Sequence, residues 1–316
     1  MEHFVTLFDS KFLPQGLCLH DSLLRHAQPF QLWIVCMDQE VHEQLESLRL
    51  PHVSLMHLAD FESQALLDVK PGRSKAEYCW TVTPFTAEWV FSQDTQVERV
   101  TYIDADLWFF NDPQLLFHEF EQSGKHVMIT EHAYAPQYLQ YLESSGRFCV
   151  QFMVFDRSSA ARSVMQWWQA RCLEWCYARL EDGKFGDQKY LDVWPEMFPQ
   201  EVHILKRVEQ TLAPWNVDHL LQGQKPGFTP VFFHFHAFRI IAPDRVKLFE
   251  GYHIASTSRY LYAEYLASLS RQCKVLHQHG IPMALLPERH SFKSRLRSWL
   301  ITAKGLSARV RINTRA

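Results

Sequence analysis

Two acidic residues separated by one small residue are the best candidates for chemistry in this sequence. Asp104-Ala105-Asp106 follows an apolar segment at 99–103 and precedes another at 107–110. Carboxylate oxygens are hard ligands that suit Mg²⁺ or Mn²⁺, and these ions commonly complete their coordination with phosphate oxygens. Two unpaired acids between buried segments would be costly without a cation. The pair therefore predicts a divalent-metal site, and a solvated loop after a strand is the alternative.

A second polar group lies in the apolar segment from Val231 to His236. Side chains alternate between the two faces of a strand, so His234 and His236 share one face. Two histidines on one face could hold a metal or a phosphate group. The alternative is a pair of histidines whose polar atoms are satisfied inside the core.

A third group is the loop from Gly183 to Asp192, in which two glycines precede Asp187 and Gln188 at the start of an expected helix. Short polar side chains at this point could fix the hydroxyl groups of a ligand, whereas the alternative is that Asp187 only caps the helix. The turn Ala213-Pro214-Trp215-Asn216 is of the kind that lines carbohydrate sites, and plain packing explains it equally well.

The elements that must position these residues alternate between strand and helix. This alternation predicts an α/β fold with a mostly parallel sheet, which binds ligands at the carboxyl ends of its strands, where Asp104 and Asp106 fall. We also expect a helix from Ser158 to Gly183. The other expected strands are Phe4–Phe8, Leu32–Cys36, Val53–Leu58, Arg99–Ile103, His126–Thr130, Phe148–Phe155 and Val231–His236, and the other helices are Gln15–His26, Glu40–Leu48, Phe61–Leu67, Thr83–Phe91 and Ser258–His277.

The composition excludes several classes of protein. Hydrophobic residues make up 47% of the 316 residues and charged residues 21%, as in an ordinary globular protein. A formal net charge of −3 gives no indication of a nucleic-acid partner. No apolar run approaches the ~20 residues that a membrane-spanning helix needs. The seven cysteines have no metal-binding or disulfide spacing, so we expect a cytoplasmic protein.

The motifs of this chain, and the order in which they occur, resemble those of GT-A-fold glycosyltransferases. The resemblance is to the retaining family that includes glycogenin and bacterial lipopolysaccharide glucosyl- and galactosyltransferases. The resemblance spans residues 4–240. Five elements carry it: Phe8-Asp9-Ser10-Lys11-Phe12, Asp104-Ala105-Asp106, Asp187-Gln188 with Leu191, Ala213-Pro214-Trp215-Asn216, and His234-Phe235.

The resemblance implies a GT-A-like, Rossmann-type, mostly parallel sheet flanked by helices, with a smaller acceptor-side region and C-terminal helices. Residues 1–250 would form the nucleotide-sugar transferase domain. Residues 251–316 would form a C-terminal helical region with a basic tail.

The resemblance also assigns roles to residues. Asp104, Asp106 and His234 would bind Mn²⁺ or Mg²⁺ on the diphosphate of a UDP-sugar, and Asp187 and Gln188 would be the catalytic residues at the donor sugar. The other donor contacts that we expect are Asp9, Phe12, Arg73, Lys75, Asn216 and His236.

The function that follows is transfer of a hexose from a UDP-sugar to a carbohydrate or lipid-linked acceptor, in the synthesis of surface polysaccharide or lipopolysaccharide. Retention of anomeric configuration is implied by the resemblance alone, and in an inverting route Asp187 would be the candidate base. One alternative is a non-catalytic protein that binds nucleotide-sugars or glycans. Another is a phosphohydrolase, although in that class Asp-x-Asp usually follows the first strand and Asp104 follows the fourth.

The chain departs from the family pattern at four places, which leaves the donor sugar open. Lys11 stands where an asparagine is common, and Cys149-Val150-Gln151 replaces an Asn-x-Gly motif. Ala237 replaces a glycine, and Arg239 is a displaced candidate for an expected lysine.

The C-terminal tail predicts contact with the inner membrane face. Residues 287–316 carry eight basic residues and one acid, so this segment is +7 and the rest of the chain is −10. If Phe292 to Lys304 is helical, apolar residues share one face and basic residues flank it; an ordinary docking helix followed by a solvated tail is the alternative.

We therefore expect the full chain to co-sediment with anionic vesicles at low salt, and not with neutral vesicles, because each basic residue near an anionic surface contributes ~1 kcal/mol. Deletion of residues 290–316 should release the protein. Absence of binding to anionic vesicles at low ionic strength, where screening is weakest, would contradict the membrane hypothesis.

Overall fold

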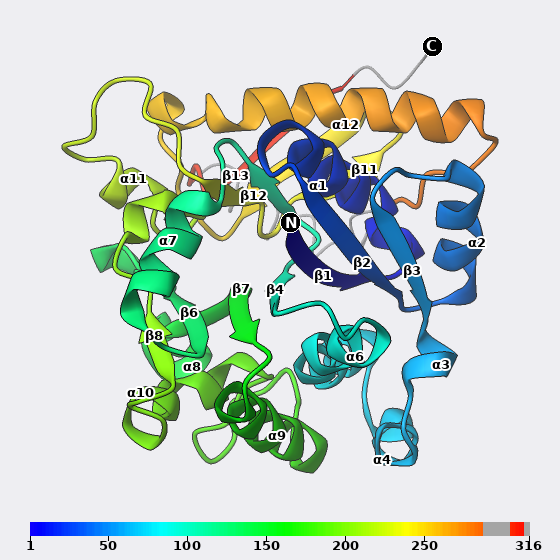
Figure 1. Cartoon of the computed structure of the whole chain (residues 1–316). Helices are drawn as coiled ribbons and strands as arrows, with labels where there is room; N and C mark the ends of the chain where they lie inside the picture. Colours follow the sequence, from blue (N-terminus) through cyan, green and yellow to red (C-terminus); the bar gives the residue numbers. More distant parts are fainter. Residues whose placement is uncertain (287–303, 313–316) are drawn as a thin grey trace.

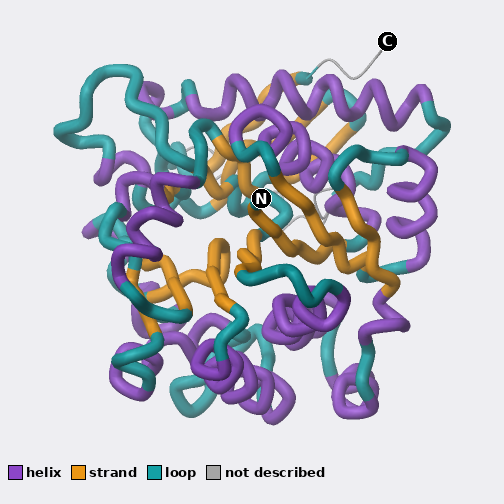
Figure 2. Tube along the Cα trace, in the orientation of Figure 1, coloured by secondary structure: helices purple, strands orange, loops and turns teal. Residues whose placement is uncertain are grey.

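A seven-stranded sheet forms the centre of the molecule in the computed structural model, which describes residues 1–286 and 304–312 (Figures 1 and 2). The strand order is β3-β2-β1-β4-β7-β6-β8. Within this sheet β7 alone runs against its neighbours β4 and β6, so the expected mostly parallel sheet is confirmed. The strands are β1 (Glu2–Phe8), β2 (Phe30–Cys36), β3 (Val53–His57), β4 (Arg99–Ile103), β6 (Val127–Glu131), β7 (Phe148–Asp156) and β8 (Val202–Ile204).

Helices cover both faces of this sheet, which explains why its central strands are apolar almost throughout. Along β1, Phe4 and Phe8 belong to one hydrophobic cluster, and Val5 and Leu7 belong to another on the opposite face. Helices α1 (Leu13–His26), α2 (Gln39–Leu48) and α7 (Gln114–Ser123) supply apolar side chains to the first cluster. Helices α5 (Lys75–Val82), α6 (Thr86–Gln93) and α9 (Ser159–Glu174) supply them to the second.

Two small sheets complete the described fold. The first joins β5 (Leu107–Phe109), β10 (Phe232–His234) and β9 (Thr211–Leu212). The second joins β11 (Arg239–Ala242), β12 (Arg245–Glu250) and β13 (Ser307–Arg311). Strand β13 was not expected from the sequence, and it pairs with β12 across the predicted division at residue 250. That division itself stays a prediction.

The helix expected from Ser158 to Gly183 is shorter than predicted. Ser158 caps α9 as expected, with its hydroxyl accepting from the amide of Ala161, but the helix ends at Glu174. Trp175 already has an extended backbone, with φ −154° and ψ 123°. The apolar spacing misled because Trp175 and Cys176 are buried from a loop, which preserves the pattern without the helix.

Two other expected elements are divided or cut short. The helix expected at Phe61–Leu67 is two short helices, α3 (Leu58–Phe61) and α4 (Gln64–Val69), because Ser63 caps a new start. The strand expected at Val231–His236 retains only β10, after which the chain turns at Ala237 with φ 63°. The remaining short helices are α8 (Tyr141–Ser145), α10 (Trp194–Met197) and α11 (Val217–Leu220).

The amphipathic helix predicted for Phe292 to Lys304 lies outside the described residues, apart from Lys304. Within the part of the chain that is described, no helix combines the length and the apolar character needed to cross a bilayer. The expected membrane contact therefore stays a prediction.

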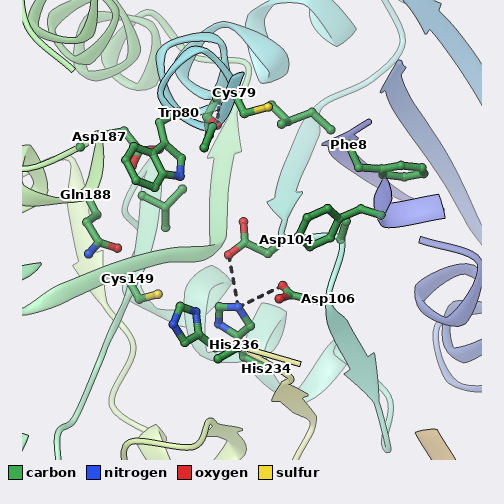
Figure 3. A pocket seen from close by; sticks show the side chains of 18 of the residues that line it. Phe8, Cys79, Trp80, Asp104, Asp106, Cys149, Asp187, Gln188, His234 and His236 are labelled. Carbon is green, nitrogen blue, oxygen red and sulfur yellow. Dashed lines mark hydrogen bonds and ion pairs between the residues drawn. The ribbon is translucent and has the colours of Figure 1, made fainter. Parts of the chain in front are cut away.

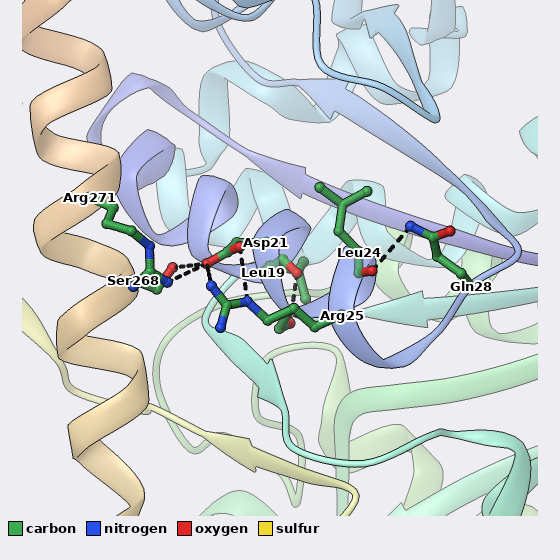
Figure 4. A network of polar contacts seen from close by, with 8 residues as sticks. Leu19, Asp21, Leu24, Arg25, Gln28, Ser268 and Arg271 are labelled. Atoms are coloured by element: carbon green, nitrogen blue, oxygen red, sulfur yellow. Dashed lines mark hydrogen bonds and ion pairs between the residues drawn. The ribbon is translucent and has the colours of Figure 1, made fainter.

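Helix α12 (Leu261–Gln278) is held against α1 by a polar network centred on Asp21 (Figure 4). The Asp21 carboxylate accepts from the Ser268 hydroxyl at 2.5 Å and from the Arg271 guanidinium at 2.9 Å. Arg25, one turn along α1, donates to both carboxylate oxygens at 3.1 Å. Burial opposes ionisation of Asp21, but the hydrogen bonds from Ser268, Arg271 and Arg25 outweigh it and lower the pKa.

We predict that Asp21→Ala lowers the free energy of unfolding by about 1.5–3 kcal/mol, because it removes charge-assisted hydrogen bonds between two helices. Arg25→Ala is the control and should cost less, about 0.5–1 kcal/mol, since it removes an exposed pair within one helix and one contact with the Trp108 ring at 5.7 Å. Denaturant titration measures both values. If the two variants lower the free energy of unfolding equally, the hydrogen bonds from Ser268 and Arg271 to Asp21 do not stabilise the packing of α12 on α1.

Candidate active site

A cavity of about 700 Å³ lies at the edge of the central sheet where β1 and β4 end. Asp9 follows β1, and Asp104 and Asp106 follow β4; all three line the cavity. Strand β10 delivers His234 to the same place. The carboxyl ends of the parallel strands therefore supply the acids, as expected from the sequence.

The structure brings Asp104, Asp106 and His234 together (Figure 3). One ligand atom from each of them lies within 4.8 Å of the others. The Nε2 atom of His234 is 3.0 Å from Oδ1 of Asp106 and 3.7 Å from Oδ2 of Asp104. Two carboxylates and one imidazole are a donor set that suits Mn²⁺ or Mg²⁺, so the residues fit the expected ion.

Backbone hydrogen bonds hold the two acids in place. The Asp104 amide donates to the Gln151 carbonyl at 3.0 Å, and the Phe235 amide donates to the Asp106 carbonyl at 2.9 Å. In the β5–β10 pair Leu107 lies opposite His234, which fixes the imidazole beside the acids. The site is therefore built on paired strands and not on a free loop.

The charges of the three groups depend on one another. Burial raises the pKa of Asp104 to about 6, and the neighbouring Asp106 adds to that shift while His234 opposes it. Burial alone would raise the pKa of Asp106 as well, but attraction and a hydrogen bond from His234 lower it to about 2. Burial opposes the charge on His234, yet Asp106 raises its pKa well above the ordinary value. The imidazolium therefore supplies positive charge to the acid pair.

Asp187 and Gln188 also line the cavity. Asp187 precedes a short 3-10 helix at Gln188–Val193, yet its side chain makes no capping hydrogen bond, so the helix-cap explanation is not supported. Its carbonyl accepts from the indole of Trp168 at 2.9 Å, which fixes the backbone. Burial, followed by repulsion from Asp104, raises the pKa of the Asp187 carboxyl to about 8.

Aromatic side chains form a further part of the cavity lining. The Trp215 ring centroid is 6.2 Å from that of Tyr134 and 6.1 Å from that of Tyr252. His132 stacks on Tyr134 at 4.6 Å and accepts the Trp215 indole hydrogen at its carbonyl. We call Tyr134, Trp215 and Tyr252 the aromatic wall.

Two expected donor contacts lie elsewhere. Arg73 is away from the cavity: its guanidinium packs on the Tyr177 ring at 3.9 Å and donates to the Leu173 carbonyl. Asn216 is buried behind the lining, where its amide donates to the His132 carbonyl at 2.9 Å and accepts from the Ala213 amide at 2.8 Å. The structure therefore does not bring these two residues to the other expected donor contacts. The Asn216 side chain instead shapes the turn that carries Trp215.

The other expected residues, Asp9, Phe12, Lys75 and His236, line the cavity. Lys75 reaches it because Ser74 and Glu77 form a capping box that starts α5 at this point. Burial, together with the charge on His234, lowers the pKa of His236 to about 4, so its ring is neutral at pH 7.

Several other residues line the cavity without belonging to any of the motifs above, among them His132, Tyr252 and Trp80. His132 could have been found, because it directly follows β6, another strand that ends at this edge. Tyr252 and Trp80 carry no such signal, because their contribution depends on how distant segments pack.

Two curated relatives cover most of the chain. The uncharacterized Bacillus subtilis (strain 168) protein YfnD is 30% identical over 279 residues, which is 85% of this chain and 89% of YfnD. The uncharacterized protein YfnF of the same organism is 31% identical over 262 residues, 77% of this chain and 84% of YfnF. No protein-family model matches the chain.

Solved structures identify the fold. The galactosyltransferase LgtC, in complex with donor and acceptor sugar analogues, is similar with a TM-score of 0.51 and 12% identity over 85% of this chain and 95% of LgtC. The glycosyltransferase GlyE of Streptococcus pneumoniae TIGR4 is similar with a TM-score of 0.52 and 13% identity over 92% of this chain and 67% of GlyE. The GT-A fold implied by the sequence motifs is confirmed.

The raised pKa of Asp187 predicts that Asp187→Asn stabilises the metal-free protein at neutral and higher pH. Below an unfolded-state pKa of about 3.9 both states are protonated, so the two proteins should be equally stable. As the pH rises, the wild-type unfolded state ionises first, and the wild type loses stability relative to the variant until about pH 8.

Melting temperatures of both proteins in EDTA, measured from pH 4 to pH 9, check this prediction. The difference should grow between pH 4 and pH 8 and then become constant. A difference that does not change with pH would mean that the Asp187 carboxyl ionises as freely in the folded state as in the unfolded state.

Proposed function

Because this chain belongs to the same family as YfnD and YfnF and has the GT-A fold, we propose that it is a metal-dependent glycosyltransferase using a UDP-sugar. It would move a hexose to a carbohydrate or lipid-linked acceptor in the synthesis of surface polysaccharide or lipopolysaccharide. We propose the cytoplasm as its location, with the basic tail at the inner membrane face.

The observation that carries this proposal is the Asp104, Asp106 and His234 group on the floor of a cavity large enough for a nucleotide-sugar. These three residues would hold Mn²⁺ or Mg²⁺. When bound, the ion supplies positive charge that stabilises a diphosphate leaving group. Acids that converge in this way without a cation are otherwise costly to the fold.

The UDP-sugar donor would lie across the Asp104, Asp106 and His234 group. Phe8 lies on one side of Asp104, and Asp187 and Gln188 lie on the other (Figure 3). Phe12 and Asp9, which also line the cavity, follow β1 in the chain. Phe12 would offer a ring face to a base, and Asp9 a carboxylate to the uracil or ribose.

Cationic side chains of the same cavity support a phosphate-bearing ligand. Lys75 lines the cavity with its side chain 74% exposed, and its ammonium lies 3.9 Å from a carboxylate oxygen of Asp38. An exposed pair at this distance is weak, so a ligand phosphate could replace it. Arg239 also lines the cavity, with its guanidinium 5.8 Å from the centre of the Phe12 ring. Both would pair with phosphate oxygens that the bound ion leaves free.

The sugar would meet Asp187 and Gln188, whose polar groups would orient its hydroxyls. In a retaining route the leaving phosphate accepts the proton of the acceptor, and the protein supplies position and charge. The aromatic wall favours a carbohydrate at the acceptor end, because indole and phenol rings stack on the C–H faces of sugars.

UDP release from a panel of UDP-sugars with Mn²⁺ tests the proposal. For a donor that the wild type turns over, we expect Asp104→Asn and Asp106→Asn to lower kcat/KM at least about 100-fold, or about 2.7 kcal/mol. EDTA should have the same effect on the wild type. Asp60→Asn, a change at an exposed carboxylate on α3, is the control and should leave turnover unchanged.

The alternatives give different results. A non-catalytic binding protein would bind UDP-sugar with Mn²⁺ and release nothing, and a phosphohydrolase would cleave phosphate esters and ignore UDP-sugars. Turnover that is equal with EDTA and with Mn²⁺ would contradict metal dependence.

A further inference from the structure

We propose that Gln151 is a positioning residue that presents the Nε2 atom of His234 to the cation. The proposal rests on the metal site argued above, and it concerns a residue at which the chain departs from the Asn-x-Gly pattern. The proposal gives Gln151 a function at the position where the family pattern has glycine.

Gln151 touches both halves of the site. Its side-chain Oε1 lies 2.8 Å from Nδ1 of His234, and its carbonyl accepts from the Asp104 amide at 3.0 Å. Gln151 is fully buried, and the His234 side chain is only 6% exposed, so water does not compete for this hydrogen bond. One residue of β7 therefore fixes the backbone of an acid and the ring of the histidine.

The amide oxygen determines which ring nitrogen carries a hydrogen. An oxygen accepts, so Nδ1 of His234 must be the donor in this contact. In the neutral ring the lone pair is then on Nε2, the atom that faces Asp104 and Asp106. Metal-bound histidines generally need a partner of this kind on the other ring nitrogen. The ring that binds the ion has one hydrogen, and the Gln151 oxygen keeps it on Nδ1. Loss of that oxygen removes this preference and admits the tautomer whose Nε2 hydrogen blocks the ion.

The side chain of Gln151 contributes little to the stability of the fold. Within the described part of the chain its Nε2 is buried and has no hydrogen-bond partner, which is unfavourable for the folded state. An apolar side chain of the same length would avoid that penalty. Replacement by Met removes the unpaired Gln151 Nε2 and leaves the Nδ1–H of His234 without its Gln151 acceptor, so the two penalties offset each other. The net contribution of Gln151 should therefore appear in metal affinity more than in stability, which separates a positioning role from a structural one.

Three variants of the full chain test this inference. Gln151→Met keeps the length and removes the acceptor, whereas Gln151→Glu keeps an acceptor oxygen at the same reach. Gln169→Met is the matched control: Gln169 is another buried glutamine, which donates to the Pro84 carbonyl and to Glu88, and none of these three residues lines the cavity. Gln151→Asn, whose shorter side chain retracts the oxygen, replaces Gln151→Met if that variant does not fold.

Mn²⁺ affinity is measured by electron paramagnetic resonance without nucleotide, and melting temperature is measured in EDTA. We expect Gln151→Met to weaken Mn²⁺ binding about 10–100-fold with little loss of melting temperature. Gln151→Glu should bind at least as tightly as the wild type. Gln169→Met should lower the melting temperature and leave Mn²⁺ affinity unchanged.

The outcomes separate this inference from the function on which it rests. If the wild type binds Mn²⁺ and Gln151→Met binds it equally well, Gln151 does not position His234. If Gln151→Glu is as weak as Gln151→Met, the acceptor oxygen is not what matters, and the inference fails in the same way. A wild type without Mn²⁺ affinity would instead overturn the metal site itself.

Discussion

The repulsion between Asp104 and Asp106 is the constraint on which the rest of the structure depends. The connection from β4 to β5 places both carboxylates beside one cavity, where their side chains are 29% and 15% exposed and water screens them only in part. His234 offsets part of this charge. A divalent ion would offset more of it, and an anionic ligand could then approach. The strands on both sides of the acids keep the three groups from relaxing apart.

Two residues with a strained backbone lie next to the residues that line the cavity. Ala133 and Ala237 both have positive φ values, 48° and 63°, beside the cavity residues His132 and His236. A non-glycine residue in this region costs of order 1 kcal/mol. The paired strands and the packed aromatic wall stabilise these turns, so rings from distant segments keep fixed positions around the cavity.

Local patterns in the sequence predicted the parts of the site that depend on local structure. The acids were identified because two apolar runs flank them, and His234 and His236 because a strand alternates its faces. Arg73 and Lys75 could not be told apart, since the choice depends on where α5 starts and on a tyrosine about a hundred residues away. The end of α9 was predicted wrongly because burial of a loop imitates helical spacing. Gln151 and His234 lie 83 residues apart in the sequence, so no local pattern predicts their contact.

The pairing of β5 with β10 sets the order in which the site is completed during synthesis. Chains emerge from the ribosome amino-terminal end first, so both acids and their β-strand appear long before β10. Until β10 docks, the nascent protein contains a carboxylate pair without its imidazole. Arrival of His234 therefore completes the pairing of β10 with β5 and offsets part of the charge of the acids in a single event. In the proposed metal site, affinity for a divalent ion would mark a chain that extends through β10, because a product truncated before β10 retains the acids and lacks His234.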